Sequence, residues 1–177
     1  MAEIFLSYRR QDSLSATGRL ADALVARFGA ARVFRDHDDI GAGEDFVAAI
    51  RRSLEVATVL LVVIGPRWLT ASDAGGRRRL DDPADFVRLE IELALRAGLP
   101  VIPVLVEGAT MPAADMLPAS LHAFARCQAV EISETRWQYD TERLIAALQA
   151  RFAIEAEAAS HRACRRTAHR RRYAQRA

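Results

Sequence analysis

Short apolar runs alternate along the chain with longer segments in which apolar residues recur every three or four positions. The runs, each of which predicts a strand, are residues 4–7, 33–34, 58–64, 101–106 and 129–132. The run at residues 58–64 is unbroken and shows no alternation, which is typical of a strand that is covered on both faces. We therefore expect it to be the central strand of the sheet.

The segments between these runs predict amphipathic helices. Leu20, Leu24 and Phe28 share one helical face, and Gly29 ends that helix. Two later helices are predicted from their apolar faces, one with Phe46, Ile50 and Leu54 and the last with Leu144, Leu148 and Phe152. Between them, Asp85 is predicted to cap a helix that runs through Ala97. Strands that alternate with helices at this spacing imply right-handed crossovers, and hence an α/β fold whose parallel sheet has helices on both faces.

Two polar segments interrupt this pattern. Residues 8–13 predict a polar turn after the first strand. Residues 71–84 predict a long loop, and structureless loops of that length are usually functional or mobile. Within the second segment, the run Arg77, Arg78 and Arg79 is interpreted as a solvated loop run, with a phosphate contact as the alternative.

The composition excludes several classes of protein. All 25 basic residues among the 177 are arginine, so a phosphate loop with its lysine, a Schiff-base enzyme and a phospho-aspartate receiver are excluded. Cys127 and Cys164 share no ligand spacing with the histidines, so we expect no metal site and no disulfide framework. No apolar run reaches membrane-spanning length, so we expect a cytoplasmic protein without a membrane partner.

The charge divides the chain into two parts. From residue 155 onward there are seven arginines and two glutamates, a balance of +5, which leaves −3 for residues 1–154. We expect one domain over residues 1–152 and a basic appendage over residues 153–177 that is a disordered tail or a linker. This appendage lacks interleaved aromatic residues, so nucleic acid is not expected as a partner.

Two glutamates of the third predicted helix differ in their surroundings. Glu92 has Arg88 and Arg96 four positions away on either side, which predicts a solvated salt-bridge residue. Glu90 has only apolar neighbours at three and four positions, namely Phe86, Val87, Leu93 and Ala94. Glu90 is therefore either a structural carboxylate bonded across the fold or a group that faces a pocket.

Further polar side chains lie at the carboxyl ends of the first two strands, the edge at which open α/β sheets bind ligands. Arg10 could meet a phosphate there, whereas Arg9 is as readily a solvated residue. Asp36 could bound the same site, with an Asx turn as the alternative. Tyr8 is expected to be structural, although its ring could flank a ligand.

Four phrases occur together in an order and spacing that resemble a bacterial TIR (Toll/interleukin-1 receptor) domain. They are residues 4–10 (IFLSYRR), 34–43 (FRDHDDIGAG), 60–68 (LLVVIGPRW), and 85–91 (DFVRLEI) followed by 101–104 (VIPV). The resemblance covers about residues 1–152. It implies a flavodoxin-like fold with a five-stranded parallel sheet. It also implies that residues 36–43 form the BB loop used in self-association, with these residues as the candidate contacts: Asp38, Asp39, Ile40, Gly41 and Gly43.

The resemblance further implies one of two activities. Some TIR domains only assemble as adaptors, whereas others cleave NAD+ between nicotinamide and ribose to give ADP-ribose or a cyclic isomer. The enzymes carry a glutamate on the third helix, four residues after an aromatic residue that is usually tryptophan. Here the pair is Glu90, as the catalytic residue, and Phe86. Together with Phe86, the resemblance makes these residues candidate substrate contacts: Tyr8, Arg10 and Asp36.

One carboxylate suffices for this chemistry, because nicotinamide leaves a pyridinium as a neutral amine and needs no general acid. NAD+ would then be a substrate, and neither a cofactor nor a metal is expected. The resulting hypothesis is an NAD+ nucleosidase that acts in bacterial immune signalling, such as antiphage defence, when it assembles with other TIR domains. The alternatives are a non-catalytic TIR adaptor that acts by homotypic contacts and a flavodoxin-like binder of another nucleotide, which the missing phosphate loops disfavour.

Overall fold

The structure is a computed structural model that describes residues 3–35 and 46–174, with the side chains of residues 46, 155 and 157–174 left aside. It divides into two compact units, Met1–Thr141 and Glu142–Ala177. The predicted self-association loop and the candidate Asp36 lie in residues 36–45, outside the described residues.

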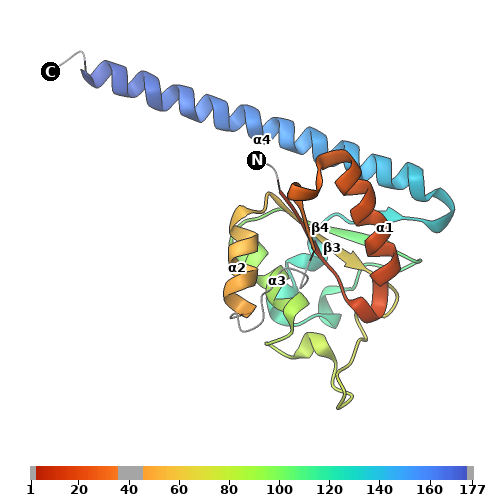
Figure 1. The fold of residues 1–177 in the computed structure, drawn as a ribbon. Helices are drawn as coiled ribbons and strands as arrows, with labels where there is room; N and C mark the ends of the chain where they lie inside the picture. Colours follow the sequence, from red (N-terminus) through yellow and green to blue (C-terminus); the bar gives the residue numbers. More distant parts are fainter. Residues whose placement is uncertain (1–2, 36–45, 175–177) are drawn as a thin grey trace. The chain divides into compact units, whose positions relative to one another are not determined.

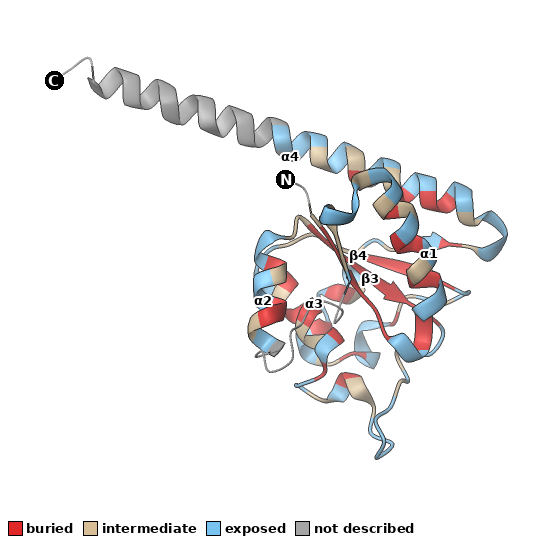
Figure 2. Cartoon of the chain, viewed as in Figure 1, coloured by how far each residue is buried: buried red, intermediate tan, exposed pale blue. Residues whose placement is uncertain are grey.

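The first unit contains a five-stranded sheet in the order β2-β1-β3-β4-β5. The strands are β1 (Ile4–Ser7), β2 (Val33–Arg35), β3 (Val59–Ile64), β4 (Val101–Val106) and β5 (Val130–Ile132). Every pairing is parallel, and the strand order is that of flavodoxin-like folds. The predicted fold class is confirmed. All six residues of β3 are buried, as expected for the central strand (Figure 2).

Helices cover both faces of this sheet, with α1 on one face and α2 and α3 on the other (Figure 1). Their bounds are α1 Arg10–Phe28, α2 Phe46–Val56 and α3 Phe86–Arg96. Short 3-10 helices occupy the connections: η1 Ala30–Arg32, η2 Arg79–Asp81, η3 Ala114–Met116, η4 Ala119–Leu121, η5 Phe124–Arg126 and η6 Glu134–Arg136. The long polar segment before α3 therefore has local structure of its own at η2.

The start of α1 differs from the sequence prediction, because residues expected in a polar turn already belong to the helix. Asp12 is buried, and its carboxylate accepts hydrogen bonds from the backbone N–H groups of Gly65 (2.8 Å) and Arg67 (2.7 Å). A Cβ at position 65 would lie 2.6 Å from Asp12 Oδ2, so any larger residue there would displace the Asp12 carboxylate. The polar residues can enter the helix because their charge is satisfied across the fold rather than by water. The helix kinks at Ser13, whose φ of −133° is not helical.

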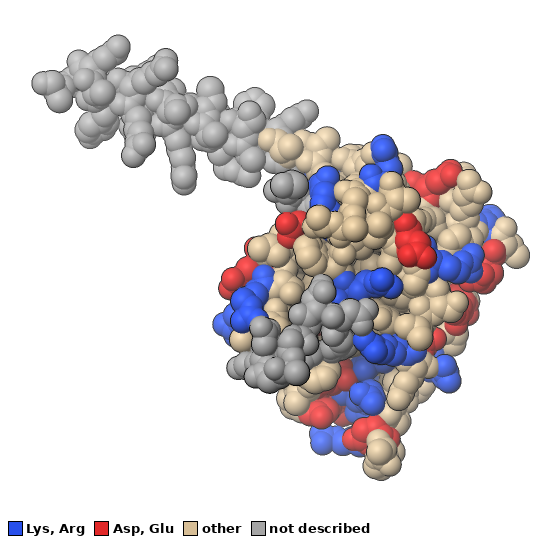
Figure 3. Space-filling view, viewed as in Figure 1, with Lys and Arg blue, Asp and Glu red and all other residues tan. Residues whose placement is uncertain are grey.

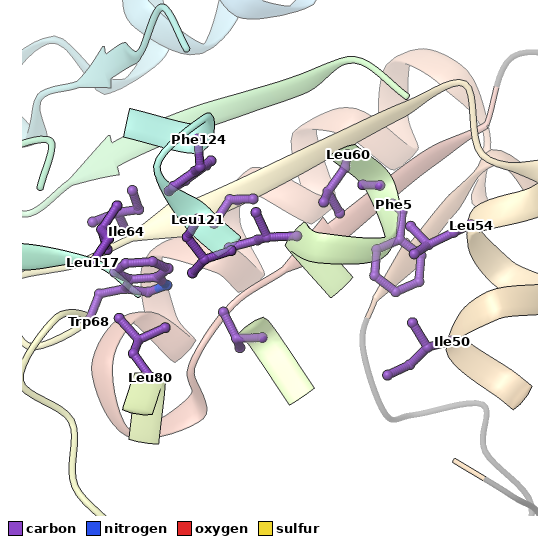
Figure 4. Packing of buried hydrophobic residues seen from close by; sticks show 14 residues of the cluster. Phe5, Ile50, Leu54, Leu60, Ile64, Trp68, Leu80, Leu117, Leu121 and Phe124 are labelled. Atoms are coloured by element: carbon purple, nitrogen blue, oxygen red, sulfur yellow. The ribbon is translucent and has the colours of Figure 1, made fainter. Parts of the chain in front are cut away.

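One apolar cluster lies between the sheet and the helices α2 and α3, and Leu20 and Leu24 of α1 are also fully buried. Figure 4 shows Trp68 close to Ile64, Leu80 and Leu117 at one end of this cluster. The indole of Trp68 has no exposed surface, and its ring centroid lies 5.9 Å from that of Phe124. Trp68 is thus a packing residue.

The last helix, α4 (Trp137–Ala174), extends beyond the expected boundary at residue 152. Its later residues contain neither glycine nor proline and are rich in alanine and arginine, which both have high helix propensity. The segment predicted as a tail or linker is therefore helical from residue 153 to Ala174. No helix in the described parts of the chain is both long and apolar enough to cross a membrane.

Candidate functional site

A cleft with a volume of about 230 Å³ lies where the end of β1 meets the start of α3. The described residues that line it are Tyr8, Arg9, Arg10, Gln11, Arg79, Asp85, Phe86 and Val87. Three candidate substrate contacts predicted from the sequence, Tyr8, Arg10 and Phe86, are thus brought together. The cleft adjoins the carboxyl end of β1, the edge at which open α/β sheets bind ligands.

A buried ion pair between two of the lining residues, Arg9 and Asp85, connects the end of β1 to the start of α3. Arg9 Nη1 and Nη2 donate to the two oxygens of Asp85 at 2.9 and 2.8 Å, and the two side chains are only 6% and 5% exposed. The guanidinium also lies 5.8 Å from the centroid of the Trp68 ring. The sequence left a solvated Arg9 open as one of two alternatives, and the structure excludes it, because the partner of Arg9 lies 76 residues away in the sequence.

The same Asp85 begins α3. Its Oδ1 accepts a hydrogen bond from the backbone N–H of Arg88 at 3.0 Å, so Asp85 is the N-cap, as predicted. One carboxylate therefore joins the end of β1 to the first turn of α3. This bond sets the position of the helix that carries Phe86 and Glu90.

Phe86 and Glu90 lie one helical turn apart on α3 but differ in exposure. Phe86 is 42% exposed and lines the cleft, whereas Glu90 has no exposed surface and is not among the lining residues. Glu90 shares the buried face of α3 with Val87 and Ala94, three positions before it and four positions after it. The candidate catalytic carboxylate is thus buried and does not line the described part of the cleft.

A sequence-family model described as "TIR domain" matches residues 4–145, about four fifths of the chain. The chain belongs to the TIR domain family. This confirms the resemblance to TIR domains that the four sequence phrases carry.

Solved structures with the same fold include other TIR domains. Those of the activated Roq1 resistosome recognizing the pathogen effector XopQ superpose with a TM-score of 0.59 at 13% identity, covering 84% of this chain and 99% of that chain. A TIR-STING receptor from C. gigas, in complex with 2',3'-cGAMP, has a TM-score of 0.56 at 18% identity, covering 82% of this chain and 38% of that chain. At these identities the likeness shows the fold alone. A search of curated proteins finds no match.

The second glutamate of α3 has a structural role in this TIR domain. Glu92 accepts hydrogen bonds from Arg88 Nε (2.8 Å), Arg96 Nη2 (3.0 Å) and Ser120 Oγ (2.6 Å), and its side chain is only 9% exposed. The predicted salt bridges are confirmed, but the expected solvation was wrong. Burial raises the pKa of Glu92, yet the hydrogen bonds from Arg88 and Ser120 and the two nearby charges outweigh it and leave the pKa below its ordinary value. Glu92 is therefore an ionised residue that ties α3 to η4.

The arginine run before α3 is not uniformly solvated either. Arg78 Nε and Nη2 donate to the carboxylate of Asp81 at 3.0 and 2.5 Å, and Arg78 Nη1 donates to the carbonyl of Met116 at 2.8 Å. Arg77 is exposed, whereas Arg79 is half-buried and lines the cleft. The sequence identifies the run but does not show which arginine faces the site, because that depends on the path of the loop.

Sequence reasoning missed two further features of the TIR domain site. It identified Asp85 as a helix cap but not as the partner of Arg9, and it raised a phosphate contact only for the arginine run as a whole, without assigning Arg79 to the cleft. No cluster of three or more His, Cys, Asp and Glu side chains suited to a metal ion occurs within the described parts of the chain.

Proposed function

We propose that this TIR domain cleaves NAD+ at the bond between nicotinamide and ribose, with Glu90 as the catalytic carboxylate. The observation that carries the proposal is the arrangement on α3, where an exposed aromatic ring in an arginine-lined cleft precedes a buried glutamate by one helical turn. The TIR family includes NAD+ hydrolases that carry such a pair.

The proposed chemistry needs one negative charge. As the C–N bond breaks, its electron pair leaves with nicotinamide, and positive charge develops on the ribose. A carboxylate held in a low-dielectric site stabilises that positive charge strongly, and its surroundings do not have to reorganise as the bond breaks. Water that attacks the anomeric carbon gives ADP-ribose and a proton, whereas a group of the same ligand gives a cyclic isomer.

Each cleft residue has a place in this scheme. Phe86 would border the nicotinamide, Tyr8 would flank the ligand, and Arg10 would meet a phosphate. Asp36 would bound the site, on the sequence argument alone. The described cleft, at about 230 Å³, is smaller than the 300–1,000 Å³ of typical ligand sites, so we infer that further elements complete it around a dinucleotide.

The non-catalytic adaptor remains the second candidate because one observation favours it. Glu90 is fully buried and lies outside the described lining of the cleft. An adaptor would need no exposed carboxylate, whereas the enzyme must bring the ribose and Glu90 together. Assembly that rearranges the site would reconcile the buried glutamate with catalysis.

Nicotinamide release per protein chain is expected to rise with protein concentration. The loop of residues 36–43 carries three aspartates, Ile40 and two glycines, a composition suited to a surface element that a neighbouring subunit could hold. Ile40→Asp should lower activity and assembly together, as measured by an NAD+ assay and light scattering on the same samples. Full specific activity in a dilute, monomeric sample would contradict this coupling.

Phe86→Ala is expected to lower turnover more than Phe86→Trp. Phe86 is 42% exposed at the cleft, so tryptophan can be accommodated and offers a larger face to the nicotinamide. Initial rates and melting curves should be measured for both variants. A Phe86→Trp protein that is inactive and melts well below the wild type would instead mark Phe86 as a packing residue.

We propose, finally, a role in bacterial immune signalling, such as antiphage defence. The support is the sequence resemblance to bacterial TIR domains, together with the family match. Loss of NAD+ in cells that express the wild-type chain, but not in cells that express Glu90→Gln, is the expected result.

A further inference from the structure

One residue of the cleft, Gln11, lies outside the sequence motifs and has no role in the proposed chemistry. It belongs to the first turn of α1, is exposed, and lines the cleft together with Tyr8 and Phe86. Within the described part of the chain, the side-chain amide of Gln11 makes no hydrogen bond, and only its backbone carbonyl is an acceptor. Because an amide has an acceptor oxygen and a donor nitrogen, Gln11 offers a ligand in the cleft a neutral donor–acceptor pair.

The backbone that carries the Gln11 side chain is fixed. The Gln11 carbonyl accepts a hydrogen bond from Arg67 Nη2. The next residue, Asp12, is buried, and its carboxylate accepts hydrogen bonds from the backbone N–H groups of Gly65 and Arg67 at 2.8 and 2.7 Å. A ligand that pairs with the Gln11 amide therefore has to order one side chain but no backbone segment, which keeps the entropic cost of binding low.

The described cleft suits one aromatic ring rather than a whole dinucleotide. Its volume of about 230 Å³ is below the range of roughly 300–1,000 Å³ that is typical of ligand sites. Phe86 is exposed there and offers a face on which a planar ring can pack. A ring that packs on Phe86 would therefore lie in the same small cleft as the Gln11 amide.

Arginine side chains alone would not distinguish a ring that carries a carboxamide from the same ring with a carboxylate. Figure 3 shows arginine side chains exposed on the face around the lower end of α1, and a guanidinium donates to a carboxylate at least as well as to a carboxamide. The Gln11 amide does distinguish the two groups. Its oxygen can accept a hydrogen bond from a carboxamide nitrogen, whereas a carboxylate has no proton to donate to it.

We propose that Gln11 determines specificity by selecting a ring that bears a carboxamide, the nicotinamide of NAD+, over the same ring that bears a carboxylate. Gln11 Nε2 would donate to the carboxamide oxygen, and Oε1 would accept from the carboxamide nitrogen. The identity of this ligand rests on the proposed function. A site that hydrogen-bonds a polar group of its substrate rejects an analogue without that group, because its own polar atoms are then left unpaired.

The selection is measured by ligand-observed NMR titrations of the full chain with nicotinamide and with nicotinic acid. The wild type should bind nicotinamide more tightly. Gln11→Leu removes both polar atoms from a side chain of similar size, so it should weaken nicotinamide binding by about 10- to 100-fold, as expected for two lost hydrogen bonds. It should not weaken the binding of nicotinic acid.

Gln128→Leu is the matched control for this variant. Gln128 is also exposed, but its amide donates to the Ala129 carbonyl at 3.3 Å and it does not line the cleft. Gln128→Leu should bind nicotinamide like the wild type. Adenosine is titrated as well, because the N6 and N7 atoms of adenine offer the same donor–acceptor pair as a carboxamide.

Three results would overturn the role of Gln11: no binding of nicotinamide by the wild type, equal nicotinamide affinity in Gln11→Leu and the wild type, or a loss in Gln11→Leu of adenosine binding alone. Cleavage assays with NAD+ and with nicotinic acid adenine dinucleotide separate this role from the proposed function. Nicotinamide release by the wild type, with the same preference for NAD+ in Gln11→Leu, contradicts the role of Gln11 but supports the proposed function. Nicotinamide binding that depends on Gln11, in a protein that does not cleave NAD+, supports the role of Gln11 but contradicts the proposed function.

Discussion

Glu90→Gln is expected to lower the rate of nicotinamide release from NAD+ by about 10²- to 10³-fold, the usual cost of losing one preorganised electrostatic contact to a transition state. The substitution keeps the volume of the side chain but removes the charge that opposes the developing cation. The loss of activity should therefore occur without a lower melting temperature.

The control for this variant must be a carboxylate without structural partners of its own. Glu92 is unsuitable, although it lies two residues away, because it holds Arg88, Arg96 and Ser120. Glu55 is exposed near the end of α2 and is not part of the cleft lining. Glu55→Gln should be as active as the wild type. Equal nicotinamide release by Glu90→Gln and Glu55→Gln would show that Glu90 is not the catalytic residue.

Arg9→Met is expected to lower the free energy of unfolding by about 3–5 kcal/mol, because it leaves the buried carboxylate of Asp85 without its partner. Asp85→Asn should cost a similar amount, since it leaves the Arg9 guanidinium unpaired while asparagine still caps α3. The double variant should lose clearly less than the sum of the two single losses. Urea unfolding of the four proteins measures these differences.

An exposed ion pair of the same length is the control for this set. Arg19 and Glu134 also lie 2.8 Å apart, but their side chains are 45% and 52% exposed. Glu134→Gln should therefore cost less than about 1 kcal/mol. If Arg9→Met costs no more than Glu134→Gln, then the Arg9–Asp85 pair does not hold β1 and α3 together.

Local sequence patterns predict the elements of this fold well. The unbroken run at residues 58–64 predicts a central strand, and β3 is fully buried. Asp85 before an apolar helical face predicts a cap, and its carboxylate accepts the hydrogen bond from Arg88 N–H. Both signals lie within a few residues of the feature that they predict, so no knowledge of the tertiary structure is needed.

The errors concern residues whose partners are distant in the sequence. Arg9 and Glu92 carry charges, which favours an exposed position, yet each is buried because another element supplies the opposite charge or a hydrogen bond. Asp12 enters α1 for the same reason, since its acceptors are used by Gly65 and Arg67. Such pairings depend on the path of the whole chain, and one sequence does not encode them in any local pattern.

NAD+ cleavage by this TIR domain is measured by incubating the wild-type chain with NAD+ at high protein concentration and quantifying NAD+, nicotinamide and ADP-ribose products by chromatography. We expect nicotinamide to accumulate in an amount equal to the NAD+ consumed, matched by linear or cyclic ADP-ribose. NAD+ that stays intact in the presence of assembled protein would show that this TIR domain is an adaptor and not an NAD+ nucleosidase.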